Sequence, residues 1–261
     1  MIVKTLEEIE LIRQSSLLVG KTLAEVAKIM KPGVKTSDID KLAETFILDN
    51  GAKPGFKGYG GFPATLCISI GEEVVHGIPG DRELKDGDLV SVDCGTFLNG
   101  FYGDYAYSFA IGECDDKIIK LQEATKESLY LGAAQAILGK RIGDIGAAIQ
   151  NHVEERGYSV VRDLVGHGIG RNLHERPEVF NYGRKGVGKK LPENLVICIE
   201  PMINMGVKEV VQDKDGWTIR TRDNKASAHF EHTVVVKADK PEFLSTYKYI
   251  EEVLKQNINI R

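Results

Sequence analysis

Residues 89–93, Leu-Val-Ser-Val-Asp, form an apolar run of strand character that ends on a carboxylate. A second such run extends from Phe101 to Ile111, and Gly100 lies between the two runs. We expect the runs to pair as a β-hairpin. Asp104 follows Asp93 by eleven positions, so the hairpin would bring two acidic side chains close together in an otherwise apolar setting.

The second half of the chain repeats this pattern. Residues 196–200, Val-Ile-Cys-Ile-Glu, are again an apolar run ending on a carboxylate, and His76-Gly-Ile-Pro79 has an echo in His174-Glu-Arg-Pro177. The spacing of Gly33 to Gly51 also matches that of Gly139 to Gly157. We interpret the chain as a single catalytic domain, 1–261, with an internal duplication into halves at about 1–112 and 113–261.

The expected elements are helices followed by strands in each half, which predicts an α+β fold with long strands packed under helices. The capping box Thr5-Leu-Glu-Glu8 predicts a helix that ends before Pro32-Gly33. Helices are expected at Thr5–Met30, Ser37–Gly51, Asp116–Leu138 and Ile142–Arg156, strands at Leu66–Ile70, Leu89–Cys94 and Phe101–Ile111, and mostly strand and loop from Gly157 onward.

Composition narrows the class of protein. The 261 residues are 42% apolar and 28% charged, which is ordinary for a globular protein. A net charge of -4 gives no reason to expect nucleic acid. The acidic N-terminus and short apolar runs predict a cytoplasmic protein with neither signal peptide nor membrane span. Four cysteines without a CxxC pair are expected to be reduced, buried thiols: Cys67, Cys94, Cys114 and Cys198.

Four carboxylates stand at strand positions where core residues would be usual: Asp93, Asp104, Glu200 and Glu231. Each alone is more often a solvated side chain than a ligand. Together in one interior they would repel one another, and divalent cations would remove that cost. His167, between glycines in Gly166-His-Gly-Ile-Gly170, is the imidazole candidate. Oxygen ligands with one imidazole suit first-row ions such as Mn, Co, Fe or Zn.

Three other histidines are weighed separately. His152 falls in a helical stretch and is expected to be an ordinary surface or packing residue. His232 alternates away from Glu231 along a strand, so the two should face opposite sides. His229 shares a face with Glu231 and could approach the site, a question that the sequence leaves open.

Taken together, these residues resemble the type I methionine aminopeptidases over nearly the whole chain. The matching stretches are Cys67-Ile-Ser-Ile, Val75-His-Gly-Ile-Pro79, Asp86-Gly-Asp-Leu-Val-Ser-Val-Asp93, Gly103-Asp104, Gly166-His-Gly-Ile-Gly-Arg171, His174-Glu175, Ile199-Glu-Pro-Met202, Asp215-Gly-Trp217 and Phe230-Glu-His-Thr233. The resemblance implies the pita-bread fold, with two pseudo-twofold halves whose antiparallel sheet is covered by helices. The chain shows no zinc-binding extension, and in this respect it resembles the short bacterial-style form of the family.

The resemblance also implies a dinuclear metallo-aminopeptidase. Asp104 and Glu231 would bridge two divalent ions (Co, Mn, Fe, Zn or Ni), Asp93 would complete one site, and His167 with Glu200 the other. A metal-bridging hydroxide would attack the peptide bond. Glu200 would shuttle the proton of the attacking water.

Two further histidines would be catalytic in the same family. His174 would stabilise the tetrahedral intermediate, and His76 would contact the scissile amide. The methionine pocket maps onto Phe56, Tyr59, Phe62, Cys67, His76, Leu173, His174 and Trp217. Position 56 is Phe and position 173 is Leu where family members often carry Cys and Phe, which alters the shape of the pocket and leaves the metal ligands untouched.

The implied function is removal of the initiator methionine from nascent polypeptides when the second residue is small. A hydrolase of the Xaa-Pro aminopeptidase or prolidase type is the alternative within the fold. A non-catalytic peptide-binding relative is the alternative outside enzymes, and it would be expected to have lost ligands. The implied partner is the N-terminus of a new polypeptide. The resemblance also implies a monomer that works in proximity to the ribosome, but no residue of this chain indicates the oligomeric state or a ribosome contact.

Overall fold

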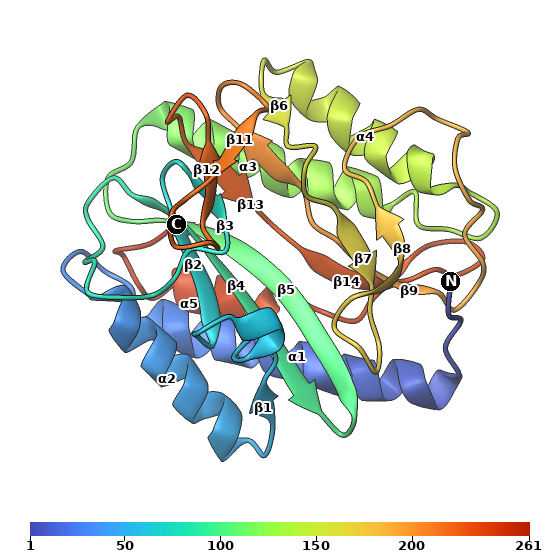
Figure 1. The fold of residues 1–261 in the computed structure, drawn as a ribbon, viewed down its shortest axis with the longest axis horizontal. Helices are drawn as coiled ribbons and strands as arrows, with labels where there is room; N and C mark the ends of the chain where they lie inside the picture. Colours follow the sequence, from blue (N-terminus) through green and yellow to red (C-terminus); the bar gives the residue numbers. More distant parts are fainter.

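Helices and strands alternate along the chain in two rounds, and the computed structural model describes all residues from 1 to 261 (Figure 1). The helices are α1 (Leu6–Ile29), α2 (Thr36–Asp49), the 3-10 turn η1 (Tyr59–Gly61), α3 (Asp116–Ala133), α4 (Ile142–Glu154) and α5 (Lys248–Leu254). The strands are β1 (Lys53–Pro54), β2 (Leu66–Ile70), β3 (Glu73–Val75), β4 (Leu89–Leu98), β5 (Phe101–Ala110), β6 (Ser159–Val160), β7 (Gly166–Gly168), β8 (Glu175–Val179), β9 (Val196–Ile199), β10 (Met202–Asn204), β11 (Val210–Gln212), β12 (Ile219–Thr221), β13 (Ser227–His229), β14 (His232–Val235) and β15 (Glu242–Phe243).

The predicted hairpin is the longest pair of strands in the protein. β4 and β5 pair antiparallel over ten residues each, and Asn99 and Gly100 form the turn with φ of 53° and 83°. Two successive positive φ values match the right-handed twist of a hairpin, and Asn-Gly tolerates them well. β4 continues past the predicted end at Cys94 because every residue as far as Leu98 has a partner on β5.

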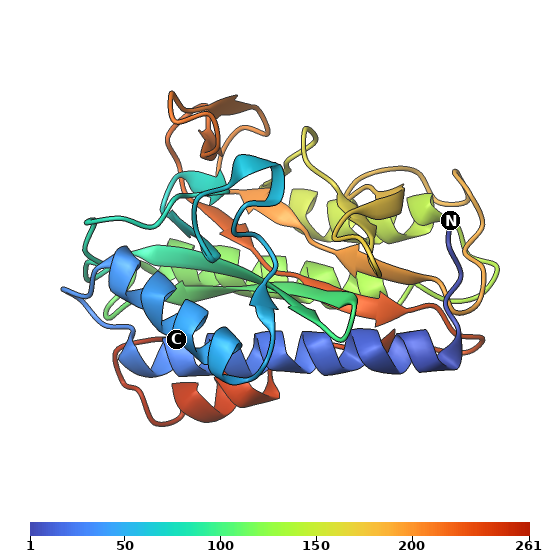
Figure 2. The ribbon, with the colours of Figure 1, turned by 60° about the horizontal axis from the view of Figure 1, so that its bottom comes forward.

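Helix α1 lies along this hairpin, below it in Figure 2. Its first turn has the predicted capping box, in which the Glu8 N–H donates to the Thr5 hydroxyl at 3.2 Å and the Thr5 N–H donates to the Glu8 carboxylate at 3.1 Å. The Thr96 hydroxyl of β4 donates to the Ser15 carbonyl at 3.0 Å. The helix is therefore fixed both at its start and against the strand that carries Asp93.

The second half contributes a five-stranded antiparallel sheet in the order β15-β14-β9-β7-β8. A three-stranded sheet, β13-β10-β6, lies beside helices α3 and α4, which pack against each other. Figure 1 shows β14, β9, β7 and β8 beyond β5, on the side of the molecule away from β2. These sheets meet the hairpin near the middle of the molecule, where the two halves face each other.

Several predicted boundaries were wrong by a few residues. α3 ends at Ala133 rather than near Leu138, because the Leu138 N–H donates to the Lys237 carbonyl at 2.8 Å and draws the chain out of the helix. α5 was not predicted at all, and it packs on α1.

The α+β fold class is confirmed, and one cluster of buried apolar side chains runs from Leu18 to Ile260 through both halves. The duplication itself stays a prediction. None of the helices combines the length and apolar character that crossing a bilayer requires.

We predict that Gly103→Ala lowers the free energy of unfolding by about 1–3 kcal/mol. A Cβ at this position would meet the main chain of Ser15 and Ser16, so α1 would have to move off β5. Urea unfolding followed by circular dichroism measures the change. Gly80→Ala is the matched control, because a Cβ there meets nothing within 4 Å. Equal stability of the two variants would contradict the close approach of helix and hairpin.

Candidate active site

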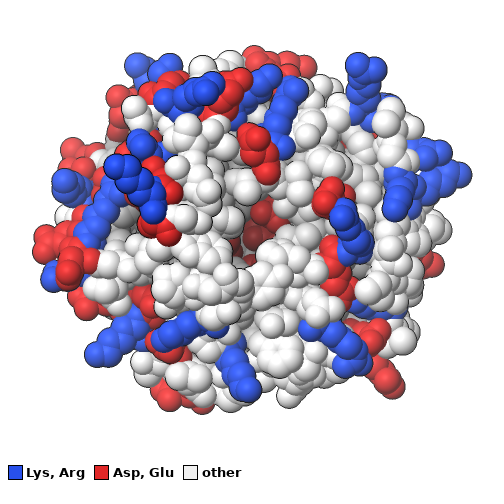
Figure 3. Space-filling model, viewed as in Figure 1, with Lys and Arg blue, Asp and Glu red and all other residues white.

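A cavity of about 140 Å³ opens where the two halves meet. Figure 3 shows a hollow near the middle of this face with acidic atoms at its bottom. All thirteen residues singled out as metal-binding, catalytic or substrate-binding line this cavity: Phe56, Tyr59, Phe62, Cys67, His76, Asp93, Asp104, His167, Leu173, His174, Glu200, Trp217 and Glu231. The structure thus brings the whole predicted set together, and the role of each residue stays a prediction.

The hairpin supplies the first two carboxylates. Asp93 pairs with Ala106 and Asp104 pairs with Gly95, so the two acids are diagonal neighbours on the same face of the strand pair. Gly95 leaves room opposite Asp104, and the ring of Phe56 fills the space that a side chain there would need.

The second half supplies His167, Glu200 and Glu231. His167 lies in β7, Glu200 follows β9 directly, and Glu231 stands between β13 and β14. His167 Nε2 lies 3.5 Å from Glu200 Oε1 and 3.7 Å from Asp104 Oδ2. His167 Nδ1 lies 3.0 Å from the Gly168 carbonyl. With its proton donated to that carbonyl, the ring turns the lone pair of Nε2 toward the carboxylates, as metal-ligating histidines do.

Main-chain contacts hold the two halves together at this point. The Glu231 N–H donates to the Ala106 carbonyl at 3.1 Å, and the Thr233 hydroxyl donates to the Asp104 carbonyl at 2.7 Å. The Tyr247 hydroxyl lies within 2.9 Å of the carbonyls of both Ala106 and Glu231. The carboxylates of β5 and of the segment before β14 are therefore held in register independently of any ligand.

Burial dominates the electrostatics of the acidic side chains. It raises the pKa of Asp93 to about 7, and burial together with neighbouring carboxylates raises the pKa of Asp104, Glu200 and Glu231 well above the ordinary value. One oxygen of each of the four acids is buried without a hydrogen-bond partner. Leaving such groups unpaired costs about 1–3 kcal/mol each, and bound cations would satisfy them.

Burial also keeps the histidines of the cavity neutral. It lowers the pKa of His167 to about 3 and lowers the pKa values of His76 and His174. The rings of His167 and His174 meet edge to face at 4.3 Å, and the Tyr59 hydroxyl lies 2.9 Å from His174 Nδ1. His76 has a φ of 60°, a strained conformation that is uncommon for a residue other than glycine and clusters at functional sites.

The remaining wall of the cavity is apolar. Phe56, Phe62, Cys67 and Leu173 are buried there, and the rings of Phe62 and Trp217 meet edge to face at 5.2 Å. A slot of aromatic rings with one sulfur fits an apolar, polarisable side chain of modest size.

Two residues join the acidic cluster without having been assigned to it. Cys198 belongs to a group with Asp104, His167 and Glu231, and His229 belongs to a second group with Glu200 and Glu231. The β-type alternation of residues 229 and 231 pointed to His229 but left its approach undecided. Cys198 could not be separated from a core residue, since it alternates within the apolar run that precedes Glu200.

The other histidines and cysteines behave largely as expected. His152, on α4, pairs with Glu127 of α3 at 3.0 Å, and its side chain is 11% exposed. His232 is buried away from the cavity, stacked on Tyr247. All four cysteines are free. Cys114 is half-buried rather than buried as predicted, because it lies after β5, close to the point where Ile111 pairs with Ile260 near the C-terminus.

A buried ion pair supports the segment that carries His174. Lys4 Nζ lies 2.6 Å from Glu175 Oε2, and both side chains are about 5% exposed or less. The other oxygen of Glu175 accepts the Asn172 N–H at 3.3 Å. The residues before α1 thus brace the start of β8, one residue after His174.

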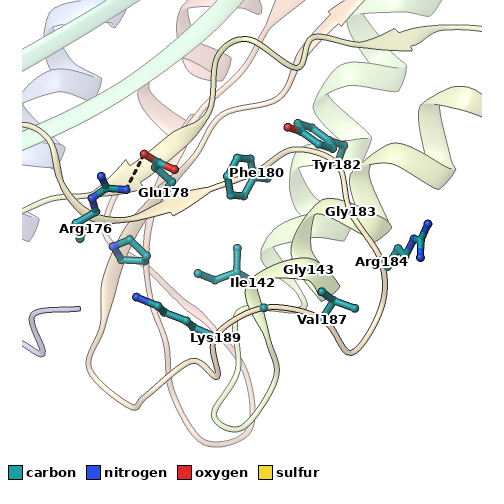
Figure 4. Close-up of a pocket in the computed structure, with 12 residues that line it drawn as sticks. Ile142, Gly143, Arg176, Glu178, Phe180, Tyr182, Gly183, Arg184, Val187 and Lys189 are labelled. Atoms are coloured by element: carbon teal, nitrogen blue, oxygen red, sulfur yellow. Dashed lines mark hydrogen bonds and ion pairs between the residues drawn. The ribbon is translucent and has the colours of Figure 1, made fainter.

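A larger hollow of about 420 Å³ lies elsewhere, between β8 and the start of α4. Figure 4 shows Ile142, Phe180 and Val187 facing it and the Arg176–Glu178 ion pair at its edge. Its lining holds no histidine or cysteine, and Glu178, its one carboxylate, is already paired. None of the predicted site residues lines this hollow, whereas all of them line the smaller cavity.

Comparison with known proteins agrees with this geometry. The model of metallopeptidase family M24 matches residues 10–238 of this chain. A methionine aminopeptidase of Clostridium acetobutylicum is 51% identical over 94% of this chain and 98% of its own length. The crystal structure of methionine aminopeptidase from Rickettsia prowazekii superposes with a TM-score of 0.93 at 39% identity, covering 94% of this chain and all of that one.

The prolidase from Pyrococcus horikoshii superposes with a TM-score of 0.77 at 23% identity and covers 95% of this chain and 64% of that chain. This likeness shows the shared pita-bread fold alone. The matches at 51% and 39% identity confirm the resemblance seen in the sequence and identify a metal-dependent peptidase. The chain therefore belongs to metallopeptidase family M24 and, within that family, to the methionine aminopeptidases.

Proposed function

We propose that the protein removes the N-terminal methionine from polypeptides whose second residue is small. The observation that carries this proposal is the convergence of four carboxylates and a neutral imidazole beside an apolar slot in one cavity. The charged end of the cavity suits hydrolysis of a peptide bond, and the apolar end suits the side chain to be released. The names of the relatives at 39–51% identity support the same reading.

Two divalent ions fit the donor set. The unpartnered oxygens of all four acids and the neutral Nε2 of His167 are groups that such ions would satisfy. Asp93, Asp104 and Glu231 would hold one ion, and Asp104, His167, Glu200 and Glu231 would hold the other. Oxygen-rich ligands with imidazole accept several first-row ions, among which we propose Co, Mn, Fe, Zn or Ni. When bound, the ions polarise the scissile carbonyl and lower the pKa of the attacking water.

Three side chains of the cavity have distinct roles in the proposed reaction. Glu200 takes the proton of the attacking water and delivers it to the leaving amine. His174, held by its contact with Tyr59, donates a hydrogen bond to the oxygen on which negative charge develops. His76, fixed by its main-chain conformation, contacts the scissile amide. Because His76 and His174 are largely neutral at pH 7, each can offer an N–H without adding charge beside the ions.

The limited volume of the cavity supports the choice of substrate. Phe56, Phe62, Leu173 and Trp217 enclose the apolar end of a cavity of about 140 Å³, and we propose that the methionine side chain fills this end. A bulky second residue would have to find room beside His76 and His174, so we propose that small second residues are preferred. Substrates of this kind are new polypeptides in the cytoplasm. A monomeric state and work near the ribosome stay predictions.

A peptide panel tests the function. We expect methionine release from Met-Ala-Ser, dependent on added Mn or Co, at a kcat/KM at least about 100-fold above that for Met-Leu-Ser or Leu-Ala-Ser. Chromatography of the released amino acid measures the rates. Cleavage of an Ala-Pro peptide instead would move the protein to the proline-specific branch. Inactivity of the folded protein with every metal would favour a binding role.

Glu200→Gln tests the proton transfer. We expect kcat to fall by about 10²–10⁴-fold while KM for Met-Ala-Ser changes by less than about threefold, because proton transfer is needed in the transition state and not for binding. Steady-state kinetics at saturating metal separates the two constants. Glu193→Gln, at an exposed position nearby in the sequence, is the matched control. An equal change in kcat and KM would argue against the assigned role.

Metal binding should release protons in a pH-dependent way. At pH 6 Asp93, with a pKa of about 7 in the metal-free protein, carries a proton that the ion must displace, whereas at pH 8 it is mostly ionised. His167, with a pKa of about 3, stays neutral at both values and releases none. We therefore expect more protons released per ion, and weaker binding, at pH 6. Calorimetry in two buffers of different ionisation enthalpy counts the protons, and an unchanged count would contradict the assignment.

A further inference from the structure

His229 is a buried histidine whose ring has no hydrogen-bond partner. Its exposed fraction is 1%, and both Nδ1 and Nε2 are buried without a donor or acceptor within reach. Neither the proposed reaction nor the ligand set described above gives it a role. An imidazole in this condition loses its contacts to water and gains nothing in return.

A second buried histidine shows what a purely structural ring looks like in this protein. His232 is also 1% exposed, and its Nδ1 lies 2.6 Å from the Ser245 hydroxyl while its Nε2 lies 3.2 Å from the Tyr130 hydroxyl. The fold thus satisfies a buried imidazole that serves packing. His229, three residues away, is left unsatisfied on the side of the carboxylates.

The spacing around His229 is that of a shared ion. One ligand atom from each of Glu200, His229 and Glu231 lies within 4.8 Å of the others, and no hydrogen bond joins the ring to either acid. Atoms that each lie about 2.0–2.3 Å from one first-row ion are separated by about 3–4.5 Å. An oxygen of Glu200 and an oxygen of Glu231 are likewise unpartnered, so the three side chains present unfilled ligand positions toward one another.

The main chain of His229 is held firmly in place. The Ser108 hydroxyl lies 2.7 Å from the His229 carbonyl and accepts the His229 N–H at 3.0 Å, and it also lies 2.8 Å from the Ser91 hydroxyl. Ser91 and Ser108 belong to β4 and β5, which carry Asp93 and Asp104. The same hairpin therefore positions the acids and the additional imidazole.

We propose that His229 is a nitrogen ligand of the metal centre, binding a divalent first-row ion together with Glu200 and Glu231. This assignment rests on the proposed two-ion site and extends its ligand set. It makes Glu231 common to two groups, one with Asp104 and His167 and one with Glu200 and His229. A site with two imidazoles favours ions such as Co, Zn or Ni over Mg.

The test compares cobalt binding by the full-length wild type, His229→Ala and His229→Gln. Calorimetry gives the affinity of each ion, and X-ray absorption of the cobalt-loaded protein counts imidazole ligands per ion. The matched control is His152→Ala, which removes a histidine on α4 that belongs to neither group of candidate metal ligands. Circular dichroism and melting of the metal-free proteins verify that each variant is folded.

We expect His229→Ala to weaken the binding of one of the two cobalt ions by at least about tenfold. The number of imidazole ligands per ion and the rise in melting temperature on adding cobalt should both fall. His229→Gln keeps a polar side chain of similar size and should not restore either. His152→Ala should bind like the wild type.

Wild-type affinity and imidazole count in His229→Ala would overturn the assignment. Restoration by His229→Gln would do so as well, because it would show that the ring only positions its neighbours, and this variant decides the matter if the alanine variant does not fold. If the wild type bound no divalent ion, the proposed function itself would be refuted. The two failures are therefore distinguishable.

Discussion

Four carboxylates in one cavity impose the constraint on which the rest of the structure depends. Asp93, Asp104, Glu200 and Glu231 repel one another when ionised, and burial raises the pKa of each. A loosely built interior would relieve this strain by moving the acids apart. The contacts of Thr233 with Asp104 and of Glu231 with Ala106 prevent that movement. The fold therefore maintains a cluster of acids that can all ionise together only when cations occupy the site.

The same cavity separates the chemistry from the choice of substrate. Its charged end is built from strands that the whole fold shares, and the prolidase from Pyrococcus horikoshii has that fold at 23% identity. Its apolar end comes from the segment around η1 and from side chains such as Leu173 and Trp217. Changes in these residues alter what fits the slot without touching the acids. The departures at Phe56 and Leu173 both lie in the lining of this apolar end.

The sequence predicted the elements that local rules govern. The capping box at Thr5 and the hairpin turn at Gly100 follow from short-range hydrogen bonding and φ preferences. The convergence of thirteen residues on one cavity was predicted from the family resemblance and from the apolar runs that end on acids. The end of α3 depends on a contact with the distant residue Lys237, and α5 depends on its packing against α1. The approach of His229 depends on the hydrogen bonds between its main chain and Ser108. Such long-range contacts leave little trace in a single sequence.

The buried pair of Lys4 and Glu175 has a consequence for the order of folding during synthesis. Lys4 is translated well before its partner, which follows 171 positions later. Until then the ammonium group of Lys4 has no buried counter-ion, and only the local capping box of Thr5 and Glu8 holds the start of the first helix. The segment that carries His174 is likewise unbraced until both ends of this contact exist. The nascent chain therefore acquires its working site only after residues as distant as Glu175 have been translated.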